Sequence, residues 1–533
     1  MGENAVTKVL VTDPLAPQGL EILRAAKGID VVEAPDLSPG ALLAAIADAD
    51  ALIIRSGTKV TADVIEAGKH LKVIGRAGIG VDNVDVAAAT AHGVVVMNTP
   101  GGNTVTTAEH ALALLISLAR HIPQATASMK AGKWEKKRFI GVELFNRTLG
   151  VVGLGNIGRI VAQRARGLGM KVIAHDPFLS QSAADKLDVE LVSFEALLER
   201  ADAITVHVPR TKDTIGLLGA AAFAKMKPGV LVVNAARGGI VDEDALLEAL
   251  ESGRVGGAGL DVFVDEPVPP DHPLVKHERV VCTPHLGAAT EQAQLNVAIA
   301  IAEQVRDFLL HGVVHNAVNM PSISKELAAR IRPYLVLGEK LGRFHGQLCT
   351  GSIESVEIEY SGDAAALPTE PITTAVLKGL LESVCDEVNM VNAPVLAKEH
   401  GIHVVESKTS RSADFTSAIA TRVTGAENRL IVGAVFHGGQ PRIVRIDDFM
   451  LEAIPEGPTL FIRNRDHPGV VGGVGTVLGE EGINISRMQL ALHLERAEAA
   501  MLVNVDQTPS DRVLRRLEDH PHIISARLVE LGS

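Results

Sequence analysis

The chain has 533 residues, of which 47% are hydrophobic and 3% aromatic, and its formal net charge is −13 at pH 7. This length suffices for three or four domains, and so acidic a chain lacks the basic face that general nucleic-acid binding needs. The most apolar helix-like run, residues 108–122, is too short to span a bilayer and carries Glu109, His110 and Arg120. We therefore expect no nucleic-acid partner and no membrane segment.

The three cysteines, Cys282, Cys349 and Cys385, lie far apart and have no metal-ligand spacing. An odd and scattered set of cysteines is typical of a reducing compartment. The first residues, MGENAVTKVLVTD, lack the basic and then apolar pattern of a secretion signal. We expect a cytoplasmic protein without a bound metal.

The first hundred residues alternate short β-like runs with amphipathic helical runs. Strands are expected at 8–13, 29–35, 51–56, 71–78 and 94–100, and helices at 17–28, 39–50, 61–70 and 85–93. Strands that alternate with helices predict a mostly parallel sheet that is covered on both faces.

A long helix over 104–121 leads into a second α/β series. Its strands are expected at 149–152, 171–177, 203–209, 229–238, 256–263 and 280–285. A further helix over 289–312 follows, and no catalytic motif is evident after it. We interpret this helix as returning to the first unit, which makes that unit discontinuous.

The pattern changes after Pro321. Residues 322–453 mix helices and strands without a chemical motif, and EAIPEGP at 452–458 is typical of a linker. The tail reads β-α-β-β-α-β over 459–466, 468–482, 484–492, 499–506, 510–520 and 523–531. This order predicts a ferredoxin-like module.

The segment LGVVGLGNIGRIV, residues 149–161, contains Gly153, Gly155 and Gly158 in G-x-G-x-x-G spacing. In such turns the glycines allow a tight turn, close approach to a pyrophosphate and close helix–strand packing, and the helix N-terminus attracts the phosphates. Asp176 follows Gly153 by 23 residues at the end of the next strand, where a carboxylate binds a ribose diol and repels a 2′-phosphate. Together these features predict NAD rather than NADP.

Later strand ends supply residues for chemistry on a hydroxy acid. Arg237 follows one strand, Asp261 and Glu266 another, and His285 a third. Ligands of doubly wound sheets bind at the carboxyl ends of strands, so these side chains are expected in one crevice. Any one of them alone is more often a surface or structural residue. As a set they suit a dehydrogenase, because Arg can bind a carboxylate and His can take a hydroxyl proton.

Several longer motifs occur in the same chain: RAGIGVDNVD, NTPGGNTVTTAEH, NAARGGIVDEDAL and PHLGAAT. With them, essentially the whole chain resembles the long-form D-3-phosphoglycerate dehydrogenases, a branch of the D-isomer-specific 2-hydroxyacid dehydrogenase family. The resemblance implies an α/β fold in which a Rossmann NAD domain (102–289) is inserted into a flavodoxin-like substrate-binding domain (1–101 and 290–320). An α+β intervening domain (321–455) and a ferredoxin-like ACT regulatory domain (456–533) would follow.

The resemblance also implies an activity. The chain would oxidise 3-phospho-D-glycerate to 3-phosphooxypyruvate with NAD, the first step of the phosphorylated route to L-serine, with reduction of 2-oxoglutarate to 2-hydroxyglutarate as a side activity. Two alternatives stay open: another D-2-hydroxyacid dehydrogenase, such as a glyoxylate or hydroxypyruvate reductase, and an NAD-sensing binding protein of the corepressor kind.

The site residues that the resemblance implies fall into three groups. The catalytic trio is Arg237, Glu266 and His285. Besides the three glycines, cofactor contacts fall on Asn156, Ile157, Asp176, Ala235, Ala236, Asp261, Gly287 and Ala288, and on the apolar Ile79 and Val208 through backbone or packing contacts. Substrate anchors fall on Arg55, Ser56, Arg76, Gly78 and Asn103.

The resemblance further implies regulation and assembly. Asn464, Asp466 and Asn484 match positions that hold L-serine in regulated relatives. A homo-oligomer, either dimer or tetramer, is expected, in which the segment KWEKKRF lends Lys136 or Lys137 to a neighbouring subunit's site.

Overall fold

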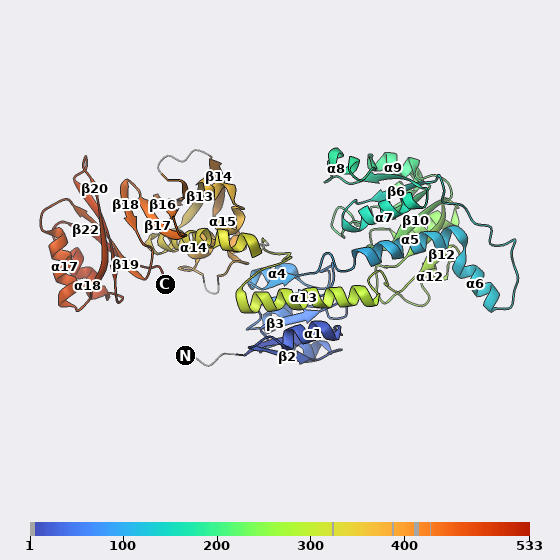
Figure 1. The fold of residues 1–533 in the computed structure, drawn as a ribbon, viewed down its shortest axis with the longest axis horizontal. Coiled ribbons are helices and arrows are strands. Elements are labelled where there is room, and N and C mark those ends of the chain that lie inside the picture. The colour runs from blue at the N-terminus through green and yellow to red at the C-terminus, as the bar shows by residue number, and fades with distance from the viewer. Residues whose placement is uncertain (1–5, 322–324, 386–387, 410–414, 427, 533) are drawn as a thin grey trace.

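The structure, a computed structural model, describes residues 6–321, 325–385, 388–409, 415–426 and 428–532. Four sheets organise this part of the chain into four units, which we call the first, second, third and C-terminal units. Figure 1 shows them in a row, with the C-terminal unit at one end and the second unit at the other. We propose that the units divide at the boundaries given above.

The first unit is a parallel sheet in the order β2-β1-β3-β4-β5, the flavodoxin-like order. Its strands are β1 (Thr7–Val11), β2 (Ile29–Glu33), β3 (Ala51–Ile54), β4 (Val73–Arg76) and β5 (Val95–Met97). Its helices are α1 (Pro17–Arg24), α2 (Pro39–Ile46), α3 (Ala62–Ala67), α4 (Val86–Ala91) and, from much later in the chain, α13 (Glu291–His311).

Helix α13 completes the core of the first unit. Its residues Val297, Ile301 and Val305 are buried together with Val9 and Met97 of the sheet. The helix packs on α1 at a glycine, Gly19, whose Cβ, if present, would lie 2.7 Å from the carbonyl oxygen of Ala298. The chain thus leaves this unit after β5 and returns to it through α13.

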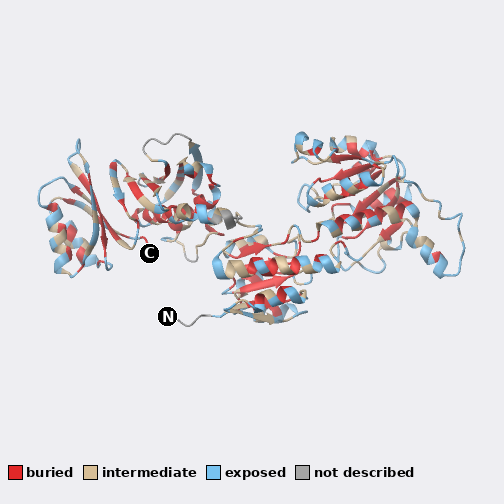
Figure 2. Cartoon of the chain, in the orientation of Figure 1, coloured by how far each residue is buried: buried red, intermediate tan, exposed pale blue. Residues whose placement is uncertain are grey.

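The second unit is a parallel sheet in the order β12-β11-β10-β9-β6-β7-β8, a Rossmann order with one added strand. Its strands are β6 (Thr148–Val152), β7 (Lys171–His175), β8 (Glu190–Leu191), β9 (Ala203–Val206), β10 (Val230–Asn234), β11 (Val255–Leu260) and β12 (Val280–Cys282). Its helices are α5 (Thr104–Arg120), α6 (Ile122–Lys130), α7 (Asn156–Gly167), α8 (Gln181–Asp185), α9 (Phe194–Arg200), α10 (Ala220–Lys225), α11 (Glu243–Glu251) and α12 (Pro273–Lys276). Buried residues follow the strands and the inward helix faces in both α/β units (Figure 2).

The third unit is a mixed sheet in the order β14-β13-β15-β16-β17-β18, in which only β13 and β14 are parallel. Its elements are α14 (Lys325–Leu348), β13 (Ile353–Gly362), a 3-10 turn (Asp363–Ala366), α15 (Glu370–Leu381), α16 (Ala393–Glu399), β14 (His403–Thr409), β15 (Ser417–Gly425), β16 (Arg429–Phe436), β17 (Gln440–Ile446) and β18 (Phe449–Ala453).

The C-terminal unit is an antiparallel sheet in the order β20-β21-β19-β22, the predicted ferredoxin-like arrangement. Its elements are β19 (Pro458–Arg465), α17 (Val470–Glu480), β20 (Ile485–His493), β21 (Glu498–Val505), α18 (Asp511–Glu518) and β22 (Ile523–Glu530). In the described ranges, no helix combines the length and the hydropathy that crossing a bilayer requires.

The third and C-terminal units share one core. The rings of Phe344 in α14 and Phe461 in β19 lie 5.9 Å apart, and Leu531 is buried in the same cluster. Lys340 of α14 donates a hydrogen bond to the carbonyl oxygen of Gly532. The segment expected as a linker at 452–458 is accordingly shorter, because β18 extends to Ala453 and β19 begins at Pro458.

Candidate active site

A cleft of about 540 Å³ lies between the first and second units. Most of the predicted residues line it: Arg55, Ser56, Arg76, Gly78, Ile79, Asn103, Asn156, Ile157, Val208, Ala235, Ala236, Arg237, Asp261, His285, Gly287 and Ala288. A larger cavity of about 740 Å³ lies between the first and third units and contains none of them. We assign the active site to the cleft, since the cationic and titratable side chains converge there.

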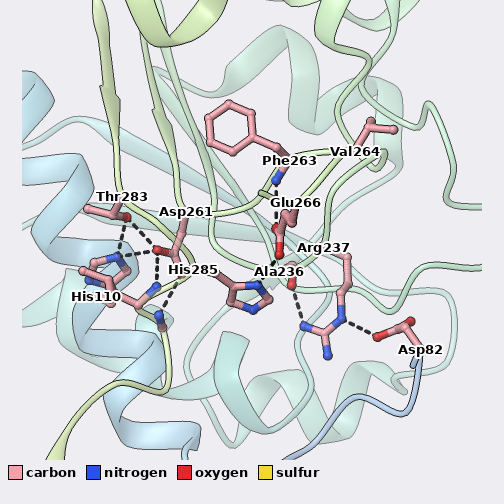
Figure 3. Close-up of polar contacts among 12 residues, drawn as sticks. Asp82, His110, Ala236, Arg237, Asp261, Phe263, Val264, Glu266, Thr283 and His285 are labelled. Carbon is pink, nitrogen blue, oxygen red and sulfur yellow. Dashed lines mark hydrogen bonds and ion pairs between the residues drawn. The ribbon is translucent and has the colours of Figure 1, made fainter. Parts of the chain in front are cut away.

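His285 and Glu266 form a close pair at the wall of the cleft (Figure 3). The Nδ1 atom of His285 lies 2.7 Å from Oε2 of Glu266. Burial alone would raise the pKa of Glu266, but the hydrogen bonds from His285 and from the backbone N–H of Phe263 outweigh it and lower that pKa. An ionised Glu266 accepts a hydrogen bond from Nδ1–H, which leaves Nε2 of His285 as the proton acceptor.

The loop that carries Glu266 is held by a residue that the sequence did not single out. Glu243, in the first turn of α11, accepts a hydrogen bond from the backbone N–H of Val264 at 2.7 Å. Its other carboxylate oxygen lies 3.2 Å from Nε2 of His272. Glu243 therefore fixes both sides of the loop and, through it, the position of Glu266.

Arg237 follows β10 and reaches across the cleft. Its Nε donates to Oδ2 of Asp82, in the first unit, at 2.7 Å, and its Nη1 donates to the carbonyl oxygen of Ala236 at 2.7 Å (Figure 3). Asn234, buried at the end of β10, accepts from the N–H of Ala236 and donates to the carbonyl oxygen of Arg237. This turn directs the guanidinium toward the first unit.

Two further arginines enter the cleft from the first unit, Arg55 after β3 and Arg76 at the end of β4. Burial and the nearby Arg237 and Arg55 lower the pKa of Arg76 to about 10, although Asp82 and Asp13 oppose the shift. Arg76 stays protonated at neutral pH, and its buried Nε has no hydrogen-bond partner among the described residues. Such a group calls for an anionic ligand.

The glycine turn fits a dinucleotide. Gly153 has a φ of 88°, and a Cβ there would lie 2.7 Å from the carbonyl oxygen of His207. A Cβ on Gly158 would lie 2.1 Å from the carbonyl oxygen of Gly153, so this position permits the close packing of α7 on the turn. Gly155 faces open space just before α7, which leaves the backbone N–H groups accessible to a pyrophosphate.

Asp176 follows β7 beside this turn. Its two carboxylate oxygens accept hydrogen bonds from the backbone N–H groups of Leu154 and Phe178, each at 2.9 Å. Asp176, Glu266 and the three glycines are not among the residues that line the cleft. A fixed carboxylate at this place favours a ribose diol over a 2′-phosphate.

Asp261 is the most buried acid of the site, with 1% of its surface exposed. Its Oδ1 accepts from the Leu286 N–H and the Thr283 hydroxyl and lies 3.0 Å from Nε2 of His110, while Oδ2 accepts from the Gly287 N–H (Figure 3). Burial alone would raise its pKa, but the bonds from His110, Thr283 and Leu286 lower it. Asp261 thus fixes the segment that begins with His285.

Within one chain, the predicted effector residue Asn484 lies apart from Asn464 and Asp466. Asn464 is 3% exposed and its Oδ1 has no partner in the described part of the chain, whereas Asp466 and Asn484 are exposed. Asn464 pairs with Ala499, and Asn484 precedes Ile485, which pairs with Val505 at the far end of β21. Six residues of strand place the two asparagines roughly 20 Å apart.

The family models that match this chain follow the second, third and C-terminal units. Family models match three segments: the NAD-binding domain of D-isomer specific 2-hydroxyacid dehydrogenases at 112–287, the D-3-phosphoglycerate dehydrogenase intervening domain at 330–447, and the ACT domain at 458–522. D-3-phosphoglycerate dehydrogenase of Synechocystis is 43% identical over 99% of this chain and 95% of its own length. That of Bacillus subtilis is 44% identical over 98% of this chain and 99% of its own length.

Solved structures match somewhat more than half of the chain. The TT0316 protein of Thermus thermophilus covers 58% of this chain and 100% of its own, with 37% identity and a TM-score of 0.55. An NAD-dependent formate dehydrogenase of Staphylococcus aureus, solved in complex with NAD, has a TM-score of 0.54 at 29% identity and covers 59% of this chain and 100% of its own. These matches confirm the predicted fold class, the oxidoreductase class and NAD as the cofactor. The chain belongs to the D-3-phosphoglycerate dehydrogenase family of D-isomer-specific 2-hydroxyacid dehydrogenases and carries that family's intervening and ACT domains.

Proposed function

We propose that this chain oxidises 3-phospho-D-glycerate at C2 to 3-phosphooxypyruvate, with NAD as the oxidant, as the first step of the phosphorylated route to L-serine. One observation carries the proposal. Three guanidinium groups, those of Arg55, Arg76 and Arg237, line the same cleft as His285, whose Nδ1 is bonded to Glu266. Relatives that match the chain over nearly its whole length are D-3-phosphoglycerate dehydrogenases.

The charges of the cleft match a substrate with a carboxylate at one end and a phosphate at the other. Arg237 follows a strand of the same sheet as His285 and suits the carboxylate next to the reacting carbon, because a guanidinium binds carboxylates through two parallel hydrogen bonds. Arg55 and Arg76 suit the phosphate, and Ser56, Gly78 and Asn103 line the same wall. The buried Nε of Arg76 would gain the partner that it lacks.

Two different groups accept the hydride and the proton that leave the substrate. Bound NAD supplies the hydride acceptor, and Gly153, Gly155, Asn156, Ile157, Gly158 and Asp176 would hold it. Nε2 of His285 takes the proton of the C2 hydroxyl as the C2–H bond breaks and the carbonyl forms. Glu266 holds Nδ1–H and stabilises the imidazolium that results.

Steady-state assays on a substrate panel test the proposal. We expect kcat/KM for 3-phospho-D-glycerate to exceed that for D-glycerate by roughly 10²-fold or more, because two charge-assisted contacts to phosphate are lost. Turnover of 2-oxoglutarate should be a minor side activity. A preference for glyoxylate or hydroxypyruvate would support a simple reductase instead, and binding of NADH without turnover on any of these substrates would support a sensor.

We also propose that L-serine binds between the ACT domains of two copies of the chain in a homo-oligomer. The separation of Asn464 from Asn484 supports a site between two copies of the chain, because one copy would supply Asn464 and the other would supply Asn484. The segment between α6 and β6 exposes apolar side chains, and Trp134 is 81% exposed. This exposure supports a second contact between subunits at this segment. Lys136 and Lys137 lie in the same segment and outside their own cleft, so a neighbour would receive them.

A serine titration tests the regulatory site. The initial rate of the wild type should fall as L-serine is added, and the curve for Asp466→Ala should be flat, because the carboxylate that binds the ammonium group is removed. Asp519→Ala, an exposed acid at the end of α18, should respond as the wild type does. Truncation near Pro455 is a poor test, since it would expose the shared core around Phe344. Wild-type rates that do not respond to serine would refute the site.

A cytoplasmic location completes the proposal. The three cysteines are described, and no disulfide joins them. Burial raises the pKa of the Cys282 thiol, which keeps this group protonated and unreactive near neutral pH. This pattern suits a reducing compartment.

A further inference from the structure

The contact between Asp82 and Arg237 joins the two halves of the active site. Asp82 follows β4 in the first unit, Arg237 follows β10 in the second, and they are 155 residues apart in the sequence. We propose that Asp82 is a positioning residue that fixes Arg237 as the carboxylate clamp and ties that clamp to the substrate-binding half. The inference rests on the proposed role of Arg237 in binding a substrate carboxylate.

The geometry shows how the guanidinium is held. Nε donates to Oδ2 of Asp82, and Nη1 donates to the carbonyl oxygen of Ala236. Nη2 lies against the backbone of Gly80, where a Cβ would be only 1.6 Å away. Three contacts therefore fix the plane of the group, two of them from the first unit. The donors that remain, on Nη2 and on the second N–H of Nη1, are those that a carboxylate in the cleft can use.

Asp82 is also the carboxylate that is available to accept a hydrogen bond from Arg237. Asp13 is nearby, but its oxygens accept from the N–H groups of Arg55 and Thr58 and from the Thr58 hydroxyl. Asp82 has no other hydrogen bond among the described contacts and is 52% exposed, against 27% for Arg237. Its charge also opposes the lowering of the Arg76 pKa that burial and the two other arginines cause.

An isolated pair on a surface contributes little to stability, so the expected effect of Asp82 concerns binding rather than folding. With Asp82 in place, the Arg237 side chain is ordered before the substrate binds, so substrate binding does not lose free energy to ordering it. Without the Asp82 carboxylate, Nε of Arg237 donates its hydrogen bond to water and the guanidinium is free to rotate. The loss should appear in KM, because the contact is the same in the ground and transition states.

Three variants test the inference. Asp82→Asn should raise KM for 3-phospho-D-glycerate about tenfold, change kcat less than about threefold, and leave the dissociation constant of NADH, measured by fluorescence, unchanged. Asp82→Glu keeps the charge and should recover most of the affinity. Asp85→Asn removes the same charge three residues further on and keeps a side chain that can cap α4, so its KM should stay within about twofold of the wild type.

Two results would overturn the inference: an Asp82→Asn enzyme with unchanged KM, or one with a lower KM, which would mean that Asp82 competes with the substrate for Arg237. If the wild type does not turn over 3-phospho-D-glycerate, the proposed function fails separately. Oxalate titrated into the NADH complex then serves as the carboxylate probe. Weaker oxalate binding in Asp82→Asn would still support the inference, and equal binding would refute it.

Discussion

Replacing His285 with asparagine is expected to lower kcat by about 10²- to 10⁴-fold, the range over which a positioned general base acts. The side chain of His285 is bonded through Nδ1 to Glu266, which leaves Nε2 to face the cleft as the proton acceptor. Asparagine has no comparable base. KM should change little, because the proposed substrate contacts are on the arginines. Steady-state rates with saturating NAD measure both constants.

The backbone at this position makes asparagine the right replacement. His285 has a φ of 55°, in the left-handed region, which asparagine adopts more readily than most residues. The loop should therefore keep its shape, and NADH binding and thermal unfolding should match the wild type. His92→Asn, on the exposed end of α4, is a matched control and should keep full turnover. Near-normal kcat in a folded His285→Asn enzyme would refute the assignment of the base.

Much of the fold follows from local sequence patterns. Alternation of apolar strands and amphipathic helices predicted both parallel sheets, and the glycine spacing predicted the turn at Gly153. Gly158 is required there because its missing Cβ lets α7 approach the turn. The contact between Glu266 and His285 was also predictable, since they follow neighbouring strands, β11 and β12, whose carboxyl ends meet at one edge of the sheet.

The remaining features depend on contacts between distant segments. Nothing near Asp82 in the sequence indicates that it meets Arg237, and His110, in the middle of an apolar helix, gave no sign of its contact with Asp261, 151 residues away. Such pairs are set by how the two units face each other, which periodicity does not encode. Likewise, motif matching places Asn464 and Asn484 in one effector site, but only the strand order shows that they lie at opposite ends of β21 within a chain.

The buried carboxylate of Asp261 leads to the second prediction with a large effect. Four donors converge on it, from Leu286, Gly287, Thr283 and His110. In Asp261→Asn one oxygen becomes an NH₂ group, so at least one buried donor loses its acceptor, at a cost of about 1–3 kcal/mol for each group left unpaired. These donors hold the backbone beside His285, so the loss of one should displace the His285 side chain from its position as the base. We therefore expect kcat/KM to fall by roughly 10²-fold.

The dependence on pH separates this role from a packing defect. The pKa of Asp261 is lowered in the folded protein, so its contribution to stability is full above the ordinary carboxyl pKa of about 4 and is lost as the pH falls through the lower folded value. The difference in unfolding midpoint between wild type and Asp261→Asn should therefore be largest near pH 7 and shrink below about pH 4. Asp202→Asn is the matched control, because Asp202 also accepts hydrogen bonds from a backbone N–H and from a side chain, and its pKa is also lowered, but it lies away from the cleft. The Asp202→Asn variant should lose stability with the same dependence on pH but keep its turnover. Wild-type turnover in Asp261→Asn would show that the loop beside His285 does not depend on the Asp261 carboxylate.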